Sequence, residues 1–368
     1  MNDSHEPIHG GAGDLRGDES TSAGRSGWSR LKAHLGFRKI GALYVWVVII
    51  VLFTILAPDT FPTLDTARMV LNQNAVTGLV ALGLVVPLSA GTFDLSIGST
   101  IALTGIVTAW FLGNSGAGAW EASLLGIAVA VVVGVGNAVV VVVMGVDSFI
   151  GTLATGAIIS AVTISVSGQQ LLLTGGGAFA HIAQGSFGGL TLPVFYLVGV
   201  MLILGIVLQS TVLGRRFYAT GFDAETARLA GVPVRWLKAF SLVVSAAVAG
   251  FAGIVLASRL GAGSPSEGPT YLLPAFAAAF LGATQFQPGR FNAWGTVTAV
   301  LMIGTGQAGL LLVGAPAWAP NVFLGLVLIV AVSITGIERR QASRRRGRLS
   351  SKRGSGDGAI QRQMSGVQ

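Results

Sequence analysis

Asp94 is the charged side chain embedded most deeply in apolar sequence, within the stretch SAGTFDLSIGS that runs from Ser89 to Ser99. An ionisable group at membrane depth is costly and is often functional. Transporters also build their sites where a membrane helix is interrupted. We therefore expect Asp94, Ser96 and Ser99 to lie near the path or the gate of a polar solute. In the alternative interpretation, Asp94 only caps a helix that begins at Leu95, and the two roles are compatible.

A group of amide side chains offers further hydrogen-bonding sites. Asn72, Gln73 and Asn74 fall in the outer half of an expected membrane span, where contact with lipid would be expensive. They could bind the hydroxyl groups of a solute in a cavity, and we expect Asn74 to lie near the translocation pathway. Alternatively, they hydrogen-bond to neighbouring helices. Gln169 and Gln170 allow the same two interpretations, and solvation of their loop is the simpler one.

A charged segment from Leu213 to Lys238 separates two apolar runs and is too long for a tight turn. Within it, residues 224–230 can form a short amphipathic helix in which Glu225 and Arg228 make an i,i+3 pair. A polar segment of this length between membrane spans is expected to have a function of its own. We interpret it as a helix on the membrane surface that contacts another protein.

The ends of this surface helix carry their own signals. Asp223 stands where an N-cap belongs, and Gly231 followed by Pro233 ends the segment. The residues expected to make the contact with the partner protein are Asp223, Glu225, Ala227, Arg228, Leu229 and Gly231.

The composition places these residues in a polytopic membrane protein. The chain has 368 residues, of which 52% are hydrophobic and 10% charged, and its mean hydropathy is +0.73. It has no cysteine and four histidines, three of them close to the N-terminus, so we expect no metal site. Walker A, G-x-S-x-G and H-E-x-x-H motifs are absent, and we expect no catalytic residues and no cofactor. Any energy from ATP must come from another chain.

The apolar runs predict an all-α fold with about ten transmembrane helices, and the charged segment lies between the sixth and the seventh. Residues 40–336 are expected to form the transmembrane domain, flanked by disordered basic tails at 1–39 and 337–368. The apolar run from Met69 is too long for one helix and must break near Pro87 to Asp94. The predicted spans are 41–57, 69–90, 95–112, 122–144, 149–166, 193–210, 239–259, 271–282, 291–313 and 319–335.

The distribution of positive charge supports this topology. The chain has 23 Lys and Arg residues. All of them except Arg68 and Arg259 lie in the two tails, in the charged segment or at Arg290. An even number of spans places all of these groups on one face, as the positive-inside rule requires, with both termini cytoplasmic. We therefore interpret the formal charge of +8 as a consequence of membrane topology and not as a sign of nucleic-acid binding.

Three segments together resemble the permease subunit of ribose/xylose-type ABC importers, the inner-membrane translocator family. They are Phe93-Asp-Leu-Ser-Ile-Gly-Ser99, the stretch from Gly221 to Gly231, and Leu256 to Gly263 with the later Gly282-Ala-Thr and Gly289-Arg290. The resemblance covers about residues 40 to 336. It implies a permease that imports a monosaccharide across the bacterial cytoplasmic membrane.

The resemblance also implies partners. These are a cytoplasmic ABC ATPase, an extracytoplasmic sugar-binding protein and a second permease copy, identical or related. The stretch from Asp223 to Gly231 would be the coupling helix that docks on the ATPase. Glu225 and Arg228 are expected to orient this helix, and Ala227 and Leu229 are expected to pack.

Other classes remain open at this point. A secondary transporter driven by a proton or sodium gradient would need ionisable groups at mid-membrane, and only Asp94 qualifies. A permease for branched-chain amino acids on a related scaffold is disfavoured by the DLSIGS stretch. A third alternative is a membrane component that transports nothing.

Overall fold

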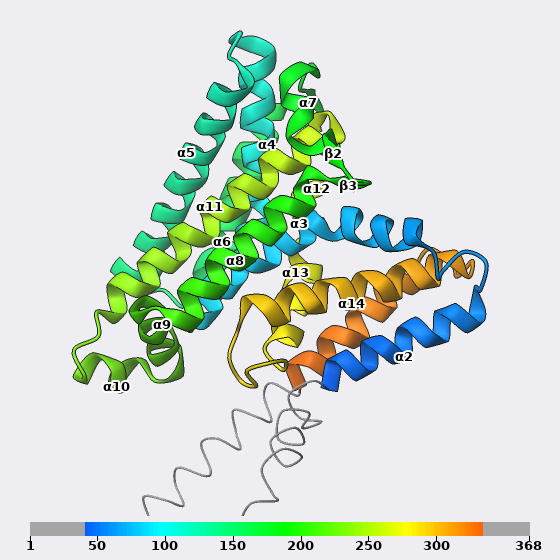
Figure 1. Cartoon of the computed structure of the whole chain (residues 1–368). Coiled ribbons are helices and arrows are strands. Elements are labelled where there is room, and N and C mark those ends of the chain that lie inside the picture. The colour runs from blue at the N-terminus through cyan, green and yellow to red at the C-terminus, as the bar shows by residue number, and fades with distance from the viewer. Residues whose placement is uncertain (1–40, 334–368) are drawn as a thin grey trace, which may run out of the picture.

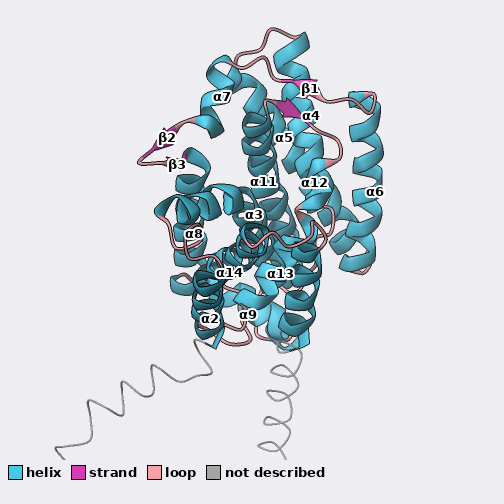
Figure 2. Ribbon diagram, turned by 90° about the vertical axis from the view of Figure 1, so that its right-hand side faces the viewer, coloured by secondary structure: helices cyan, strands magenta, loops and turns pink. Residues whose placement is uncertain are grey.

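The computed structural model describes residues 41–333, which fold almost entirely into helices (Figures 1 and 2). The predicted tails, 1–39 and 337–368, lie outside the described residues, as do residues 40 and 334–336 of the predicted transmembrane domain. The helices are α2 (Gly41–Leu56), α3 (Leu64–Ser89), α4 (Ile97–Asn114), α5 (Ala119–Ala138) continued by the π-helical turn η1 (Val139–Val143), α6 (Ser148–Ser167), α7 (Gly177–Gln184), α8 (Leu192–Ser210), α9 (Val212–Phe222), α10 (Ala224–Leu229), α11 (Val234–Leu260), α12 (Glu267–Thr270), α13 (Leu272–Gly282), α14 (Ala293–Leu312) and a last helix, Ala319–Ser333.

The strands are two short antiparallel pairs at the end of the molecule that carries α7 (Figure 2). β1 (Leu172–Leu173) pairs with β4 (Ala262–Gly263), and β2 (Ser186–Phe187) pairs with β3 (Leu190–Thr191). The long polar loop predicted after the fifth span therefore has structure of its own. It ties the start of α8 to the end of α11.

Seven described helices are long and apolar enough to cross a membrane: α3, α4, α5 with η1, α6, α8, α11 and α14. They correspond to seven of the ten predicted spans. Shorter apolar helices, Leu43–Leu56 and Ala319–Ser333, stand where the first and last spans were predicted. The eighth predicted span, 271–282, corresponds to α13, which has 11 residues. At 1.5 Å per residue it is about 16 Å long, roughly half the hydrocarbon thickness.

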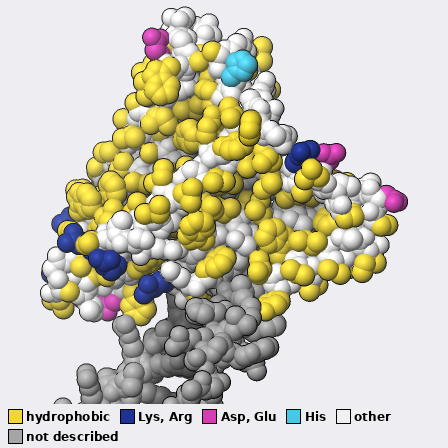
Figure 3. All heavy atoms as spheres, viewed as in Figure 1, with side chains coloured by type: hydrophobic (Ala, Val, Ile, Leu, Met, Phe, Trp, Pro, Cys, Tyr) yellow, Lys and Arg dark blue, Asp and Glu magenta, His cyan; other side chains and the backbone are white. Residues whose placement is uncertain are grey.

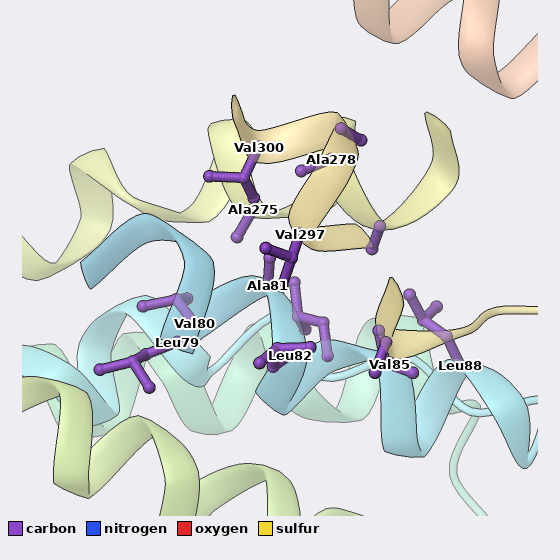
Figure 4. Close-up of a cluster of buried hydrophobic side chains, with 14 of the residues drawn as sticks. Leu79, Val80, Ala81, Leu82, Val85, Leu88, Ala275, Ala278, Val297 and Val300 are labelled. Carbon is purple, nitrogen blue, oxygen red and sulfur yellow. The ribbon is translucent and has the colours of Figure 1, made fainter. Parts of the chain in front are cut away.

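The core is built around α3, which packs against α8, α11, α13 and α14. Its residues from Leu79 to Val85 are fully buried. Figure 4 shows Leu79, Leu82 and Val85 beside side chains of α13 and α14 such as Ala278 and Val297. α13 can approach closely because Ala275, Ala278 and their neighbours are small, which is how membrane helices pack without a hydrophobic driving force.

The outer surface of α5 and α6 is apolar. Val132 and Ile158 are more than half exposed, and hydrophobic side chains cover much of the face in Figure 3. A groove of about 440 Å³ between α4, α5 and α6 is lined by apolar residues, including Leu103, Val132 and Ile158. Such a surface suits lipid and offers no hydrogen bonds to a polar solute.

The predicted interruption of the first long apolar run is confirmed. α3 ends at Ser89, just after Pro87, and α4 begins at Ile97. Residues 90–96 between them, which we call the α3–α4 break, have no regular structure. Gly91 turns the chain with φ +73°, a value that favours glycine. The predicted spans 69–90 and 95–112 therefore match two helices that lie close to these bounds.

Candidate functional site

The charged segment forms three consecutive elements: α9, the short helix α10 and the start of α11. Figure 3 shows Lys and Arg side chains gathered at the end of the molecule that Figure 1 labels α9 and α10. Asp223 is the N-cap of α10, because its Oδ1 accepts hydrogen bonds of 3.1 Å from the amides of Glu225 and Thr226. The predicted helix and its cap are confirmed, with the helix one residue shorter than the predicted 224–230.

Glu225 and Arg228 form the predicted i,i+3 pair. The Arg228 Nε donates to Glu225 Oε2 over 3.0 Å, and both side chains are about two-thirds exposed. The hydrogen bond from Arg228 lowers the pKa of Glu225 below its ordinary value, and the nearby charge of Asp223 opposes that effect. Exposed ion pairs of this kind add little to the stability of the fold. Because both side chains are exposed, another protein could contact them.

The apolar residues of α10 behave differently from one another. Ala227 is buried within the chain, whereas Leu229 is 75% exposed. Packing of both residues on a partner protein stays a prediction, and Ala227 leaves little surface for it because it is buried within this chain. Gly231 ends the helix with φ +81°, and the amide of Val232 donates to the Ala227 carbonyl over 3.0 Å.

Asp94 lies in the α3–α4 break and is fully buried. Its Oδ1 accepts from the Ser96 amide at 3.1 Å and from the Ser96 hydroxyl at 2.6 Å. Its Oδ2 accepts from the Ser245 hydroxyl of α11 at 2.7 Å. α4 begins at Ile97 and not at Leu95, so Asp94 binds the N-cap residue Ser96 and does not stand at the cap position itself. A role of Asp94, Ser96 and Ser99 in the pathway stays a prediction.

A chain of hydrogen bonds continues from Ser96 to two other helices. Asn137 of α5 donates to the Ser96 hydroxyl at 2.7 Å, and Thr155 of α6 donates to Asn137 Oδ1 at 2.6 Å. The sequence interpretation missed Asn137, Thr155 and Ser245. Asn137 gave a usable signal, since it is an amide within a Val-rich span.

The backbone of the break is also satisfied by side chains of α6. The amide of Phe93 donates to the Ser148 hydroxyl at 3.1 Å, and the amide of Leu95 donates to the Thr152 hydroxyl at 2.9 Å. Irregular backbone that is buried is stable only where its polar groups find partners in the protein. The small residue Gly156 lets α6 come close enough to supply them, because a Cβ there would lie 3.3 Å from the Ser96 Cα.

The structure does not bring Asn74 to the break. Asn74 lies 15 residues before the end of α3, about 22 Å along the helix axis. Its amide donates to the Val70 carbonyl at 2.8 Å, and its side chain lies against Gly304 of α14. A pathway role for Asn74 remains a prediction, at a different depth from Asp94.

The neighbouring amides have separate surroundings. Asn72 holds the β2–β3 turn, accepting from the Thr191 amide at 2.9 Å and donating to the Gly189 carbonyl at 3.1 Å, so its observed role is structural. Gln73 is exposed, and so are Gln169 and Gln170, which agrees with solvation of their loop.

The loop between α13 and α14 is held by one amide side chain. Asn292, the N-cap of α14, donates to the carbonyls of Gly282, Gln285 and Arg290, each at 3.1 Å. This loop contains the predicted inner cation Arg290. Through Asn292, the backbone of this loop is therefore joined to the start of α14.

These observations define the class of protein: a multi-pass helical membrane protein with a capped, exposed surface helix and a buried, internally hydrogen-bonded connection between two of its apolar helices. The chain belongs to a family of permeases. The family model described as "Branched-chain amino acid transport system / permease component" matches residues 66–332.

Curated relatives agree on the permease class. The chain is 30% identical over 297 residues to the D-allose transport system permease protein of Escherichia coli K12, covering 80% of this chain and 91% of that protein. It is 31% identical over 298 residues to the ribose import permease protein of Bacillus subtilis 168, covering 80% and 92%. It is also 31% identical over 316 residues to the L-arabinose transport system permease protein of Escherichia coli K12, covering 85% and 96%.

Proposed function

We propose that this chain is the permease subunit of an ATP-binding cassette importer that carries a monosaccharide, a pentose or hexose, into the cytoplasm. The observation that carries this proposal is the similarity over 80% or more of the chain to permeases named for allose, ribose and arabinose. The capped helix α10, with its exposed ion pair, supplies the surface that an ATPase partner requires. The chain itself binds and guides the sugar and hydrolyses no ATP.

Three partners follow from this function. A cytoplasmic ATPase docks on α10 through Glu225, Arg228 and the exposed Leu229. An extracytoplasmic sugar-binding protein delivers the sugar at the end that carries α7 and the strands. A second permease copy, identical or related, completes the translocation path, which Asp94, Ser96, Ser99 and Asn74 adjoin in at least one state of the cycle.

The topology that goes with this function has ten crossings and both termini in the cytoplasm. The seven long apolar helices supply seven crossings. The helices Leu43–Leu56 and Ala319–Ser333 and the short α13 supply the others, with α13 completed by its flanking residues. This arrangement puts α10 and Arg290 on the cytoplasmic side and α7 outside, as the positive-inside rule requires.

The docking assignment is tested by charge reversal. The double variant Glu225→Lys with Arg228→Glu, reconstituted with its ATPase and binding protein in vesicles, is expected to lose ATP-driven uptake of labelled pentose or hexose while inserting normally. The matched control is Asp65→Arg with Arg68→Glu, which reverses another exposed i,i+3 pair on the opposite side of the membrane. Undiminished uptake in the Glu225 and Arg228 double variant would refute docking at α10.

A second candidate substrate class is branched-chain amino acids, because the description of the matched family names them. Competition in the same vesicles separates the classes: excess sugar should suppress uptake of the labelled sugar, and excess leucine should not. Collapse of the ion gradient with ATP maintained should leave uptake unchanged. If uptake stopped instead, an ion-driven secondary transporter would be the better description.

A further inference from the structure

α9 lies against the α3–α4 break. The contact is between backbones: a Cβ on Gly221 would overlap the Ser89 carbonyl oxygen and would lie 3.0 Å from the Gly91 amide nitrogen. From the other side, a Cβ on Gly91 would lie 3.1 Å from the Gly221 Cα. Only glycine fits at position 221, so the end of α9 touches the end of α3 with nothing flexible between them.

A second contact lies one turn earlier on α9. The Tyr218 hydroxyl donates to the Phe291 carbonyl at 2.7 Å, and the Ser89 hydroxyl approaches the same carbonyl at 3.4 Å. The Arg290 guanidinium lies 5.2 Å from the centre of the Tyr218 ring. Burial raises the pKa of Tyr218 to about 12, so the phenol keeps the proton that it donates. α9, the end of α3 and the start of α14 thus meet at one carbonyl oxygen.

The junction is connected directly to α10. Asp223 is the C-cap of α9 and also the N-cap of α10, so no linker separates the two helices. On the other side of α10, α11 reaches the same break through Ser245 on Asp94 and through Ser241, whose hydroxyl lies 3.4 Å from that of Thr92. Both helices that flank α10 therefore contact the break.

Two buried polar side-chain atoms without a hydrogen-bond partner lie in α9 and in the loop before α14. In the described part of the chain, four buried side-chain polar atoms have no hydrogen-bond partner, and they include Thr220 Oγ1 in α9 and Gln285 Nε2 in the loop before α14. Buried polar groups are nearly always paired, and an exception calls for an explanation. A second arrangement of α9 against this loop, in which these groups find partners, would explain both.

We propose that α9 is the element that transmits movement of α10 to the α3–α4 break and to the start of α14, through Gly221 against Ser89 and Gly91 and through the hydrogen bond from Tyr218 to Phe291. This inference rests on the proposed function, because it requires an ATPase that moves α10. Tyr218 and Gly221 act as positioning residues: they need not touch the sugar or the nucleotide.

The test measures ATP hydrolysis and sugar uptake in the same vesicles, with the ATPase and the binding protein present. Tyr218→Phe and Gly221→Ala are expected to keep the ATPase bound but to raise the ATP hydrolysed per sugar transported. For Tyr218→Phe we expect about fivefold, the factor that corresponds to one lost hydrogen bond. The controls are Tyr196→Phe on α8 and Gly136→Ala on α5, where a Cβ meets nothing within 4 Å. A merely structural role would lower hydrolysis and uptake together and leave their ratio unchanged.

The possible outcomes are distinguishable. If the unmodified chain shows no ATP-driven uptake, the proposed function itself fails. If the Glu225 and Arg228 reversal abolishes uptake but Tyr218→Phe keeps the normal ratio, only the transmission through α9 is refuted. Tyr218→Phe removes a single oxygen atom, so it decides the question even if Gly221→Ala does not fold.

Discussion

The hydroxyl of Ser245 donates a 2.7 Å hydrogen bond to Asp94 Oδ2 across 151 positions of sequence. With Ser96 on the other carboxyl oxygen, this contact joins the α3–α4 break to α11, the helix that follows the surface helix α10. A buried carboxyl group is costly unless its oxygens are paired. The stability of the break and the position of α11 are therefore linked by this one contact.

Removal of the Ser245 hydroxyl should destabilise the protein measurably. Ser245→Ala leaves Asp94 Oδ2 without its partner in a fully buried site, and we expect a loss of about 1–3 kcal/mol. Thermal unfolding in detergent or nanodiscs measures it. The control is Ser123→Ala on α5, whose hydroxyl bonds only the Ala119 carbonyl of its own helix. Equal melting temperatures for the two variants would show that the Ser245 contact contributes nothing.

The hydrogen bond between Asn137 and Thr155 should appear as a coupling energy. In a double-mutant cycle of Asn137→Ala and Thr155→Val, we expect an interaction of about 0.6–1.7 kcal/mol, the range for side-chain hydrogen bonds between membrane helices. The measurement is unfolding of the two single variants and the double variant. Thr155→Val combined with Ser123→Ala should be additive. Additivity in the Asn137 cycle would mean that α5 and α6 are not joined through this pair.

Glu225 should titrate below its ordinary pKa of 4.5, because Arg228 donates hydrogen bonds to its carboxylate. A lowered folded-state pKa means that the pair is intact at neutral pH and is lost only as the pH falls through that lowered value. Carboxyl NMR of labelled Glu225 in nanodiscs follows this titration directly. In Arg228→Gln the midpoint should return toward 4.5. An unchanged midpoint in that variant would show that Arg228 is not the cause.

Gly231 should be replaceable by asparagine more readily than by alanine. Its φ of +81° lies in the left-handed region, and nothing stands within 4 Å of an added Cβ, so the penalty is purely conformational. We expect Gly231→Ala to cost about 1 kcal/mol and Gly231→Asn less. Amide hydrogen exchange in α10 reports the local stability. Equal protection of α10 in both variants, measured against Gly136→Ala, would contradict the role of Gly231 as its end.

Local features were predictable from the sequence. The Asp223 cap, the Glu225–Arg228 pair and the Gly231 terminus each involve residues two to five positions apart, and the geometry of one helical turn brings such residues together in any fold. The interruption near Pro87 was predictable as well, because an apolar run longer than the membrane is thick must bend.

The lengths of the spans were harder to predict from composition. The predicted eighth span, 271–282, matches the bounds of α13 to within one residue. Hydropathy alone does not decide whether so short a helix, with its flanking residues, crosses the membrane. Its small residues pack against α3 and α14, which brings the three helices close together (Figure 4).

The hydrogen-bond network that extends from Asp94 through Ser96 came only from the folded chain. Ser245, Asn137 and Thr155 lie on three different helices, and which face of each helix turns inward depends on how all of them pack. The same holds for Gly221 against Ser89 and for Tyr218 on Phe291. Sequence spacing describes neighbours along one helix, whereas contacts between helices arise only when distant segments share a buried interface.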